Sequence, residues 1–139
     1  MKVYQSKYNT LKGTAYLEIE RKARALYREC ARRTKRIPYV RSAYFKKDKI
    51  FLNLFWSHIN QKPRGERMRR IKYYQCALDL LRNTPFEPET RQNPNGKNEL
   101  VHRFAGMTHE GDLFYVQVKE DKRHGNKHFM SVFPPGHLA

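Results

Sequence analysis

Three strand patterns close together near the C-terminus limit most strongly how this chain can fold. Apolar, branched and aromatic side chains alternate with polar ones over residues 99–107, 112–120 and 127–133, which is typical of half-buried strands. Turns that contain Gly111 and Gly125 separate the three segments. Glycine tolerates the positive φ that short hairpin turns need. The pattern therefore predicts an antiparallel meander with one buried face.

The turn signals also predict how these strands pair. A two-residue turn at 110–111 would place His102 opposite Lys119, and a three-residue loop at 123–125 would place Lys119 opposite Phe129. Because side chains alternate along a strand, these registers divide the sheet into two faces. The expected core face holds Val101, Ala105, Met107, Phe114, Val116, Val118, Met130 and Val132. The expected open face holds His102, Phe104, Tyr115, Gln117, Lys119, Phe129, Ser131 and Phe133.

The preceding chain alternates helical and strand patterns. A helix is predicted after Thr14 and before Pro38, and a buried strand over 49–56. A second helix is expected over about 66–83 and a long loop over 84–98, which contains three prolines and an Asn-Gly pair.

These elements predict an α+β fold in a single domain. We expect an antiparallel sheet of about four strands packed on helices, with a basic N-terminal helix. Residues 1–48 would form that helical extension and residues 49–133 the core.

The net charge of +16 comes entirely from the first part of the chain. Residues 1–85 hold 22 Lys and Arg against 6 Asp and Glu, whereas residues 86–139 hold 7 against 7. Such a surplus favours a polyanionic partner, because each cation near a phosphate releases condensed counterions. The predicted nucleic-acid-binding residues combine this cluster with the open face: Arg64, Arg67, Arg69, Arg70, Tyr115, Gln117, Phe129 and Phe133.

Other classes of protein have little support in the sequence. No apolar run approaches the length of a membrane span, and no secretory leader is visible. Cys30 and Cys76 form no CxxC pair and are expected to be buried free thiols, which fits a reducing cytoplasmic setting. No metal site or cofactor is predicted, because the acidic residues are scattered and no glycine-rich phosphate loop is present.

RNA carries its own nucleophile, the 2′-hydroxyl, so cleavage needs only proton transfer and stabilisation of negative charge. A histidine opposite a lysine is favoured in its neutral, base-competent form, which makes His102 and Lys119 candidate catalytic residues. His58, which follows the 49–56 segment, is a second candidate for proton transfer.

The segments FWSHI (55–59) and FYVQVKEDKRHGNKHFMSVF (114–133) resemble the barnase–EndoU–colicin–RelE superfamily of metal-independent ribonucleases, in particular phage- and plasmid-associated members and toxin components. The resemblance covers about residues 49–133. It implies RNA cleavage through a 2′,3′-cyclic phosphate, with catalytic residues His58, His102, Lys119 and Ser131. No residue clearly takes the place of the catalytic glutamate of barnase-type members.

The sequence thus predicts a small cytoplasmic ribonuclease or ribonuclease-type toxin that acts on RNA, free or ribosome-bound. Two other classes stay open. One is a non-catalytic RNA- or DNA-binding module that uses the same basic helices and aromatic face. The other is an accessory protein whose charge serves an acidic protein partner, as between a toxin and its antitoxin or immunity protein.

Overall fold

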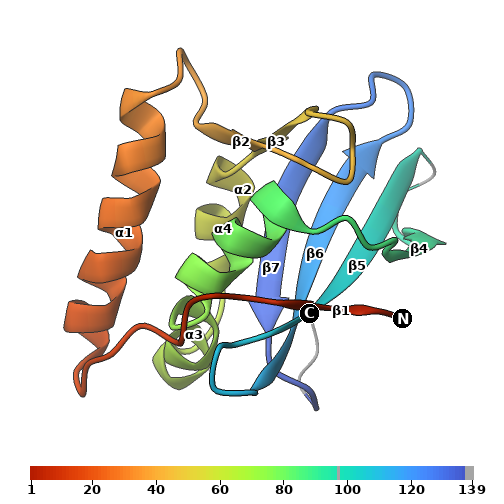
Figure 1. Ribbon diagram of the computed structural model, residues 1–139. Coiled ribbons are helices and arrows are strands. Elements are labelled where there is room, and N and C mark those ends of the chain that lie inside the picture. The colour runs from red at the N-terminus through yellow and green to blue at the C-terminus, as the bar shows by residue number, and fades with distance from the viewer. Residues whose placement is uncertain (97, 137–139) are drawn as a thin grey trace.

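A computed structural model describes residues 1–96 and 98–136. In chain order the elements are β1 (Val3–Gln5), α1 (Tyr16–Arg32), β2 (Tyr39–Arg41), β3 (Lys49–Phe51), α2 (Asn53–Ile59), α3 (Arg64–Ile71), α4 (Tyr74–Asn83), β4 (Glu89–Gln92), β5 (Glu99–Met107), β6 (Leu113–Asp121) and β7 (Lys127–Phe133). The fold is α+β, and its sheet curls into a half-barrel with helices against one side (Figure 1).

The expectation of about four antiparallel strands is wrong, because the sheet is mixed and has seven strands within the described residues. Its order is β1-β5-β6-β7-β3-β2, and β4 pairs with β5 beside β1. β1 runs parallel to β5 and β3 runs parallel to β7. The added strands β1, β2 and β4 have three or four residues each. Segments this short show no alternation that a sequence could reveal.

The predicted strand over 49–56 is also wrong in its second half. The strand ends at Phe51, and α2 begins at Asn53. Phe55 and Trp56 are buried, and the ring of Phe55 stacks on Phe129 with 4.8 Å between ring centroids. A short apolar run does not distinguish a buried strand from a buried helix, and here the run contains both.

Two further boundaries differ from the prediction. The helix expected over 66–83 is two helices, α3 and α4, which meet at residues 72–73. The loop expected over 84–98 contains β4. Among the described residues, none of the helices is long and apolar enough to cross a membrane.

The turn between β5 and β6 is one residue longer than predicted. Thr108 and Asp112 close it through their backbones, and the loop residues are 109–111, with Gly111 at φ 102°. His102 therefore lies opposite Val118, and Lys119 lies opposite Val101. The predicted pairing of His102 with Lys119 is wrong by one residue, which reverses the faces of β5.

The predicted pairing of β6 with β7 is correct at only one end of these strands. Gln117 lies opposite Ser131, as predicted. A β-bulge then places Met130 as the extra residue of β7, so Lys119 lies opposite His128 instead of Phe129.

The core face of these three strands consequently holds His102, Phe104, Phe114, Val116, Val118, Phe129 and Val132. Tyr73 and Tyr74, at the start of α4, pack against this face through Phe114 and Phe129. Burial of Val116 and Val118 is confirmed, whereas the expected exposure of His102, Phe104 and Phe129 is wrong. Val101, Ala105, Met107 and Met130, which were expected on the core face, belong to the opposite face. Ala105 is nevertheless buried there, as predicted.

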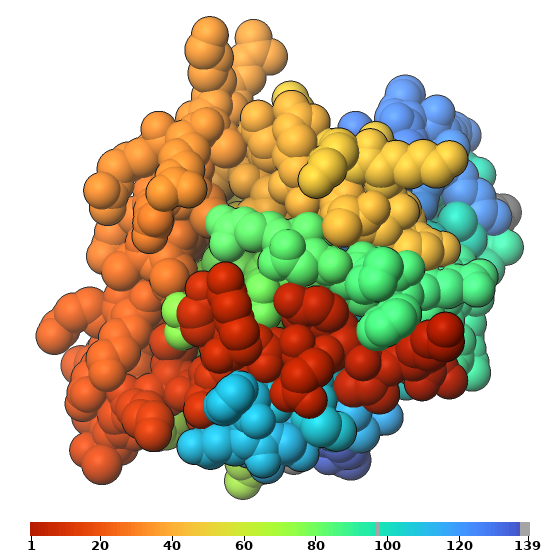
Figure 2. Space-filling view, in the orientation of Figure 1, coloured from red at the N-terminus to blue at the C-terminus, as the bar shows by residue number. Residues whose placement is uncertain are grey.

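The N-terminal segment is tied into the fold by a buried carboxylate on α4. Asp79 accepts hydrogen bonds from Tyr4 Oη at 3.1 Å, Ser6 Oγ at 2.8 Å and the backbone N–H of Lys7 at 3.3 Å. Figure 2 shows this segment crossing the surface beside the β5–β6 turn. Residues 1–48 thus contribute β1 and β2 to the same sheet as the C-terminal strands.

The corrected register makes a stability prediction. His102→Ala should lower the free energy of unfolding by about 1–3 kcal/mol, since it leaves the buried partners of the imidazole without their hydrogen bonds. Lys119→Ala, the matched change on the open face, should cost less than about 1 kcal/mol. Urea unfolding followed by circular dichroism measures both. A loss below about 1 kcal/mol from both variants would contradict the observed register, because the pairing predicted from the turn signals leaves both side chains on the open face.

Candidate nucleic-acid interface

The open face of the sheet carries three cross-strand rows of side chains. β4 extends this face, because Glu89 lies opposite Arg103 and Arg91 lies opposite Val101. Neighbouring strands are about 4.8 Å apart, so members of one row are within reach of one another. The rows, read from β7 outward, are His128–Lys119–Val101–Arg91, then Ser131–Gln117–Arg103–Glu89, then Phe133–Tyr115–Ala105–Val3.

The first row contains a histidine–lysine pair, but with a different histidine from the predicted one. His128, not His102, lies opposite Lys119. Burial lowers the pKa of His128, and the Lys119 cation lowers it further, while Asp121 and Glu99 act in the opposite direction. Lys119 Nζ lies 2.9 Å from Glu99 Oε2, which holds the cation in place. The sequence did not indicate His128 because a bulge has no reliable signature in one sequence.

The second row is polar across all its strands. Ser131 Oγ donates a hydrogen bond to Gln117 Oε1 at 3.2 Å, and both side chains are buried. The Arg103 guanidinium carbon lies 5.7 Å from the ring centroid of Tyr115 and 5.6 Å from that of Phe133. Arg103 was not predicted as a site residue. The corrected register is the signal that assigns it to this face.

A second group of cations lies at the β7 end of this face. Arg70 is only 2% exposed, with its Nε 2.8 Å from Glu66 Oε1 and its guanidinium 5.5 Å from the Phe133 ring centroid. Burial is the main cause that lowers the pKa of His58, and the charges of Lys62 and Arg70 lower it further. Because the Arg70 charge acts on His58 and the Arg70 guanidinium lies over Phe133, His58 on α2 lies toward the Phe133 end of β7.

His102 has a different environment. Its Nδ1 and Thr90 Oγ1 are 2.7 Å apart, and its Nε2 and Glu120 Oε1 are also 2.7 Å apart. The Phe45 ring covers it, with 5.0 Å between ring centroids. His102 thus connects β4 to β6 on the core face. Phe129 is fully buried on the same face and presents no ring to a base.

The structure therefore brings together five of the predicted site residues on the open face and separates others from it. The five are Tyr115, Gln117, Lys119, Ser131 and Phe133. Tyr115 and Lys119 are half-buried, whereas Gln117, Ser131 and Phe133 are buried, so the expected stacking of a base on the Phe133 ring is wrong. Of the predicted arginines on α3, Arg64 and Arg69 are exposed, while Arg67 donates to the backbone carbonyls of Lys62 and Asn60. Arg70 is buried, with its guanidinium over the Phe133 ring.

A hollow of about 310 Å³ lies on the open face where β4 faces the bulge of β7. Val101 and Met130 contribute its apolar surface. Gln117, Arg103, Glu89 and Arg91 contribute its polar groups. Glu89 Oε1 and Arg91 Nη2 are 2.6 Å apart. A concave surface with a few convergent polar groups is the usual form of a ligand site.

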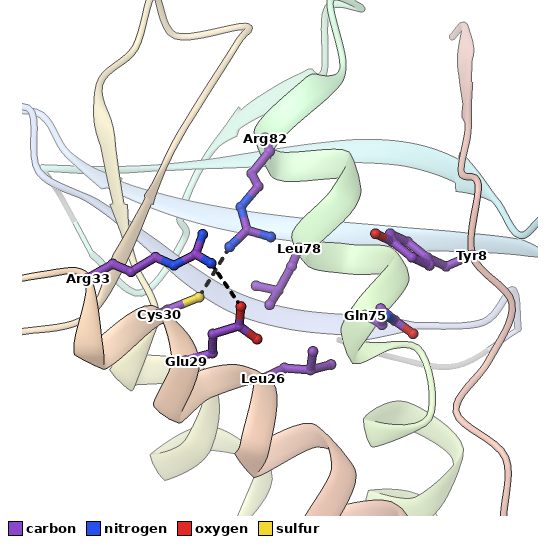
Figure 3. Close-up of a pocket in the computed structure, with 8 residues that line it drawn as sticks. All are labelled: Tyr8, Leu26, Glu29, Cys30, Arg33, Gln75, Leu78 and Arg82. Atoms are coloured by element: carbon purple, nitrogen blue, oxygen red, sulfur yellow. Dashed lines mark hydrogen bonds and ion pairs between the residues drawn. The ribbon is translucent and has the colours of Figure 1, made fainter.

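A different cavity, of about 230 Å³, lies on the helical side between α1 and α4 (Figure 3). Arg82 Nη2 donates to Cys30 Sγ at 3.3 Å, and Arg33 Nη2 lies 3.0 Å from Glu29 Oε1. Burial raises the pKa of the Cys30 thiol, although Arg82 opposes this shift. A protonated thiol is a poor nucleophile. Cys30 and Cys76 are thus buried free thiols, as the sequence indicated.

In the described part of the chain, no three His, Cys, Asp or Glu side chains gather in a way that could hold a metal ion. Comparison with protein-family models, with curated proteins and with solved structures finds no significant match to this chain.

The environment of His128 makes a titration prediction. Lys119→Gln should raise the pKa of His128 toward the ordinary value, since it removes a neighbouring cation. Lys122→Gln, a matched change in the following loop, should leave the pKa of His128 unchanged. NMR titration of the imidazole C–H resonances measures both.

The sign of the accompanying stability change follows from linkage. A His128 pKa below the ordinary value of about 6.5 means that the unfolded chain binds this proton more readily. Stability should therefore fall as the pH drops through that value, and less steeply in Lys119→Gln. If Lys119→Gln left the pKa of His128 unchanged, this result would contradict the assigned pairing of Lys119 with His128.

Proposed function

We propose that this protein is an RNA-cleaving endoribonuclease whose substrate phosphodiester lies on the open sheet face. The observation that carries the proposal is the pair of His128 and Lys119, next to the row that contains Gln117 and Arg103. It supplies a neutral imidazole, two cations and an amide donor on one surface. These are the groups that attack by a 2′-hydroxyl requires.

In the proposed reaction, His128 accepts the proton of the 2′-hydroxyl as its oxygen attacks phosphorus. The bond from phosphorus to the 5′-oxygen breaks, which leaves a 2′,3′-cyclic phosphate. Arg103 and Lys119 stabilise the charge that develops on the non-bridging oxygens. Tyr115, in contact with the Arg103 guanidinium, supplies a proton to the departing 5′-oxygen. The depressed pKa of His128 supports its role as the base, since the imidazole is neutral near pH 7.

The surface that attracts the polyanion would be larger than the group of residues that take part in the reaction. The exposed arginines on the helical side include Arg21, Arg28, Arg32, Arg64 and Arg69. They lie on α1 and α3, which pack against each other. Their attraction to phosphates is independent of sequence and sensitive to salt.

A non-catalytic RNA-binding module is the second candidate, and one observation favours it. Lys119 is held by Glu99 at 2.9 Å, and Ser131 is held by Gln117 at 3.2 Å. Both groups are thus engaged within the protein, as expected of residues that shape a binding surface. The two candidates differ only in whether bound RNA is cut.

Cleavage assays on total RNA separate the candidates. His128→Ala should reduce the cleavage rate at least about 100-fold, the scale of one general base. Arg103→Ala should reduce it by roughly 100- to 1,000-fold, as loss of an oxyanion donor does. His109→Ala, at an exposed turn, is the control and should retain full activity. Products should carry 2′,3′-cyclic phosphates, and cleavage should continue in EDTA.

The outcome that would overturn the enzyme is tight binding without cleavage across varied RNAs, with ribosomes present. A His128→Ala protein with undiminished activity would instead remove this residue from the mechanism.

RNA affinity should depend steeply on salt, with a log–log slope of several units, because several phosphates are neutralised together. Replacing Arg28, Arg64 and Arg69 by glutamine should flatten this slope by about 0.7 for each phosphate of single-stranded RNA that is no longer neutralised. Glu110→Gln, far from α1 and α3 along the chain, is the control. Fluorescence anisotropy at several salt concentrations measures the slope. A wild-type slope near zero would remove nucleic acid as the partner.

A further inference from the structure

We propose that the tip of the β2–β3 hairpin binds the phosphate backbone of RNA that extends from the open sheet face. Four cations make up this hairpin surface, namely Arg41, Lys46, Lys47 and Lys49. The inference rests on the proposed function, because it requires an RNA strand on the open sheet face. It adds a second contact with the RNA, apart from the reacting residues and from the arginines of α1 and α3.

Lys46 and Lys47 occupy positions at which the backbone disfavours lysine. They are the central residues of a turn that Asp48 closes, since its backbone N–H donates to the Phe45 carbonyl at 3.1 Å. Their φ angles are 55° and 73°. Turns with positive φ at both central residues favour Asn-Gly, because most side chains crowd the backbone in this conformation. Unfavourable backbone of this kind concentrates at functional sites, so the two lysines indicate a task for their charge.

The rest of the hairpin holds this turn in place. The Lys47 N–H donates to the Ser42 carbonyl at 2.7 Å, and Arg41 Nη1 donates to the Lys47 carbonyl at 3.0 Å. The Phe45 ring packs on the core face, with 5.0 Å between its centroid and that of the His102 ring. The turn is therefore fixed before a ligand arrives, so binding requires little further ordering of the chain.

The hairpin surface has no carboxylate to neutralise it. Asp48 is the acidic residue of the hairpin, and its carboxylate lies 2.9 Å from Nζ of Lys127, a buried cation of β7. Among the described residues, no acid lies within ion-pair distance of the four cations. Arg41 and Lys49 instead lie over the Tyr39 ring, with their charged groups 5.4 and 4.7 Å from its centroid. An anion from outside the protein can thus pair with them.

The hairpin surface borders the open face next to His128. Phe51 lies opposite His128 in the pairing of β3 with β7, and their ring centroids are 5.6 Å apart. Tyr39 lies opposite Phe51 on β2, so the row of His128 continues to this edge of the sheet. A hollow of about 430 Å³ beside the row is lined in part by Arg41, Lys49 and Phe51. RNA that lies over His128 and extends toward β2 therefore reaches the hairpin surface after about 10 Å, the width of two strand spacings.

The partner that suits these groups is a phosphodiester backbone of any sequence. Lysine is a compact charge with no fixed hydrogen-bond geometry, so it neutralises phosphates without distinguishing bases. Lys46 and Lys47 also lie outside residues 49–133, the part of the chain that resembles ribonucleases. The turn that they form is thus no part of that resemblance.

Giving the turn its preferred residues tests the inference. Lys46→Asn combined with Lys47→Gly removes two cations and relieves the unfavourable φ angles. The midpoint of thermal unfolding, followed by circular dichroism, should rise by about 2–6 °C. Affinity for a 2′-fluoro RNA of about twelve nucleotides should fall at least about tenfold in ~0.1 M salt, and the log–log salt slope should flatten by about 0.7 for each of two phosphates. Fluorescence anisotropy measures the affinity and the slope.

Two matched variants separate the possible causes. Lys46→Gln with Lys47→Gln removes the same charges and keeps the unfavourable turn, so it should weaken binding equally without raising the unfolding midpoint. Lys35→Gln with Arg36→Asn also removes two cations and relieves a positive φ, which is 62° at Arg36. These two residues belong to the exposed loop after α1, which Figure 2 shows in orange at the top left, apart from the hairpin in yellow. This variant should keep its affinity within about threefold of wild type, since salt screens separated surface charges.

The outcomes distinguish this inference from the proposed function. Equal losses of affinity in the hairpin variants and the α1-loop variant would overturn the hairpin surface, because net charge alone would then explain them. Wild-type affinity in both hairpin variants would also overturn it, and cleavage that still depends on His128 would leave the ribonuclease in place.

Two further outcomes concern the partner. Loss of affinity confined to the hairpin variants, when wild-type protein leaves matched 2′-hydroxyl RNA uncut, would support the hairpin surface and overturn the enzyme. Tighter binding of poly-L-glutamate than of RNA by wild-type protein would indicate an acidic protein partner and overturn this inference.

Discussion

The length of the turn between β5 and β6 is the constraint on which the rest of the site depends. Asp112 donates its backbone N–H to Thr108 Oγ1 at 2.9 Å, and the backbones of the same two residues close the loop. The N-terminal segment holds the loop in this form, since Tyr8 and Asn9 accept hydrogen bonds from His109 and Glu110. A loop one residue shorter would exchange the two faces of β5 relative to β6. Arg103 would then enter the core, and His102 would take its place on the open face.

The bulge in β7 is the second device that assembles this surface. His128 and Ser131 are three residues apart, so in a regular strand they would point to opposite faces. The extra residue Met130 lets both pair with open-face residues of β6, namely Lys119 and Gln117. The same bulge brings Met130 itself into the hollow. One local irregularity thus combines a histidine, a hydroxyl and an apolar contact on one side of the sheet.

The basic part of the chain and the sheet have separate tasks in the proposed function. Exposed arginines on α1 and α3 provide long-range attraction to a polyanion, whereas the sheet provides a few groups at defined positions. Arg70 lies where α3 meets the sheet. It is buried on α3, and its guanidinium lies over Phe133 of β7. Its charge adds to burial in lowering the pKa of His58. Asp79 has a purely structural role, since its buried carboxylate attaches the N-terminal segment, and with it β1, to α4.

The sequence by itself determined the α+β class, the three long strands and the surplus of charge in the first part of the chain, because periodicity and composition are local properties. It also placed Tyr115, Gln117, Lys119 and Ser131 on one face. Only the tertiary structure decided that the histidine opposite Lys119 is His128, and that Arg103 and Glu89 join this face. The short strands β1, β2 and β4 were also beyond prediction. The physical reason is that loop length, bulges and parallel pairing are set by contacts between residues far apart in the chain, such as those of Tyr8 and Asn9 with the β5–β6 turn. A local pattern contains no information about such contacts.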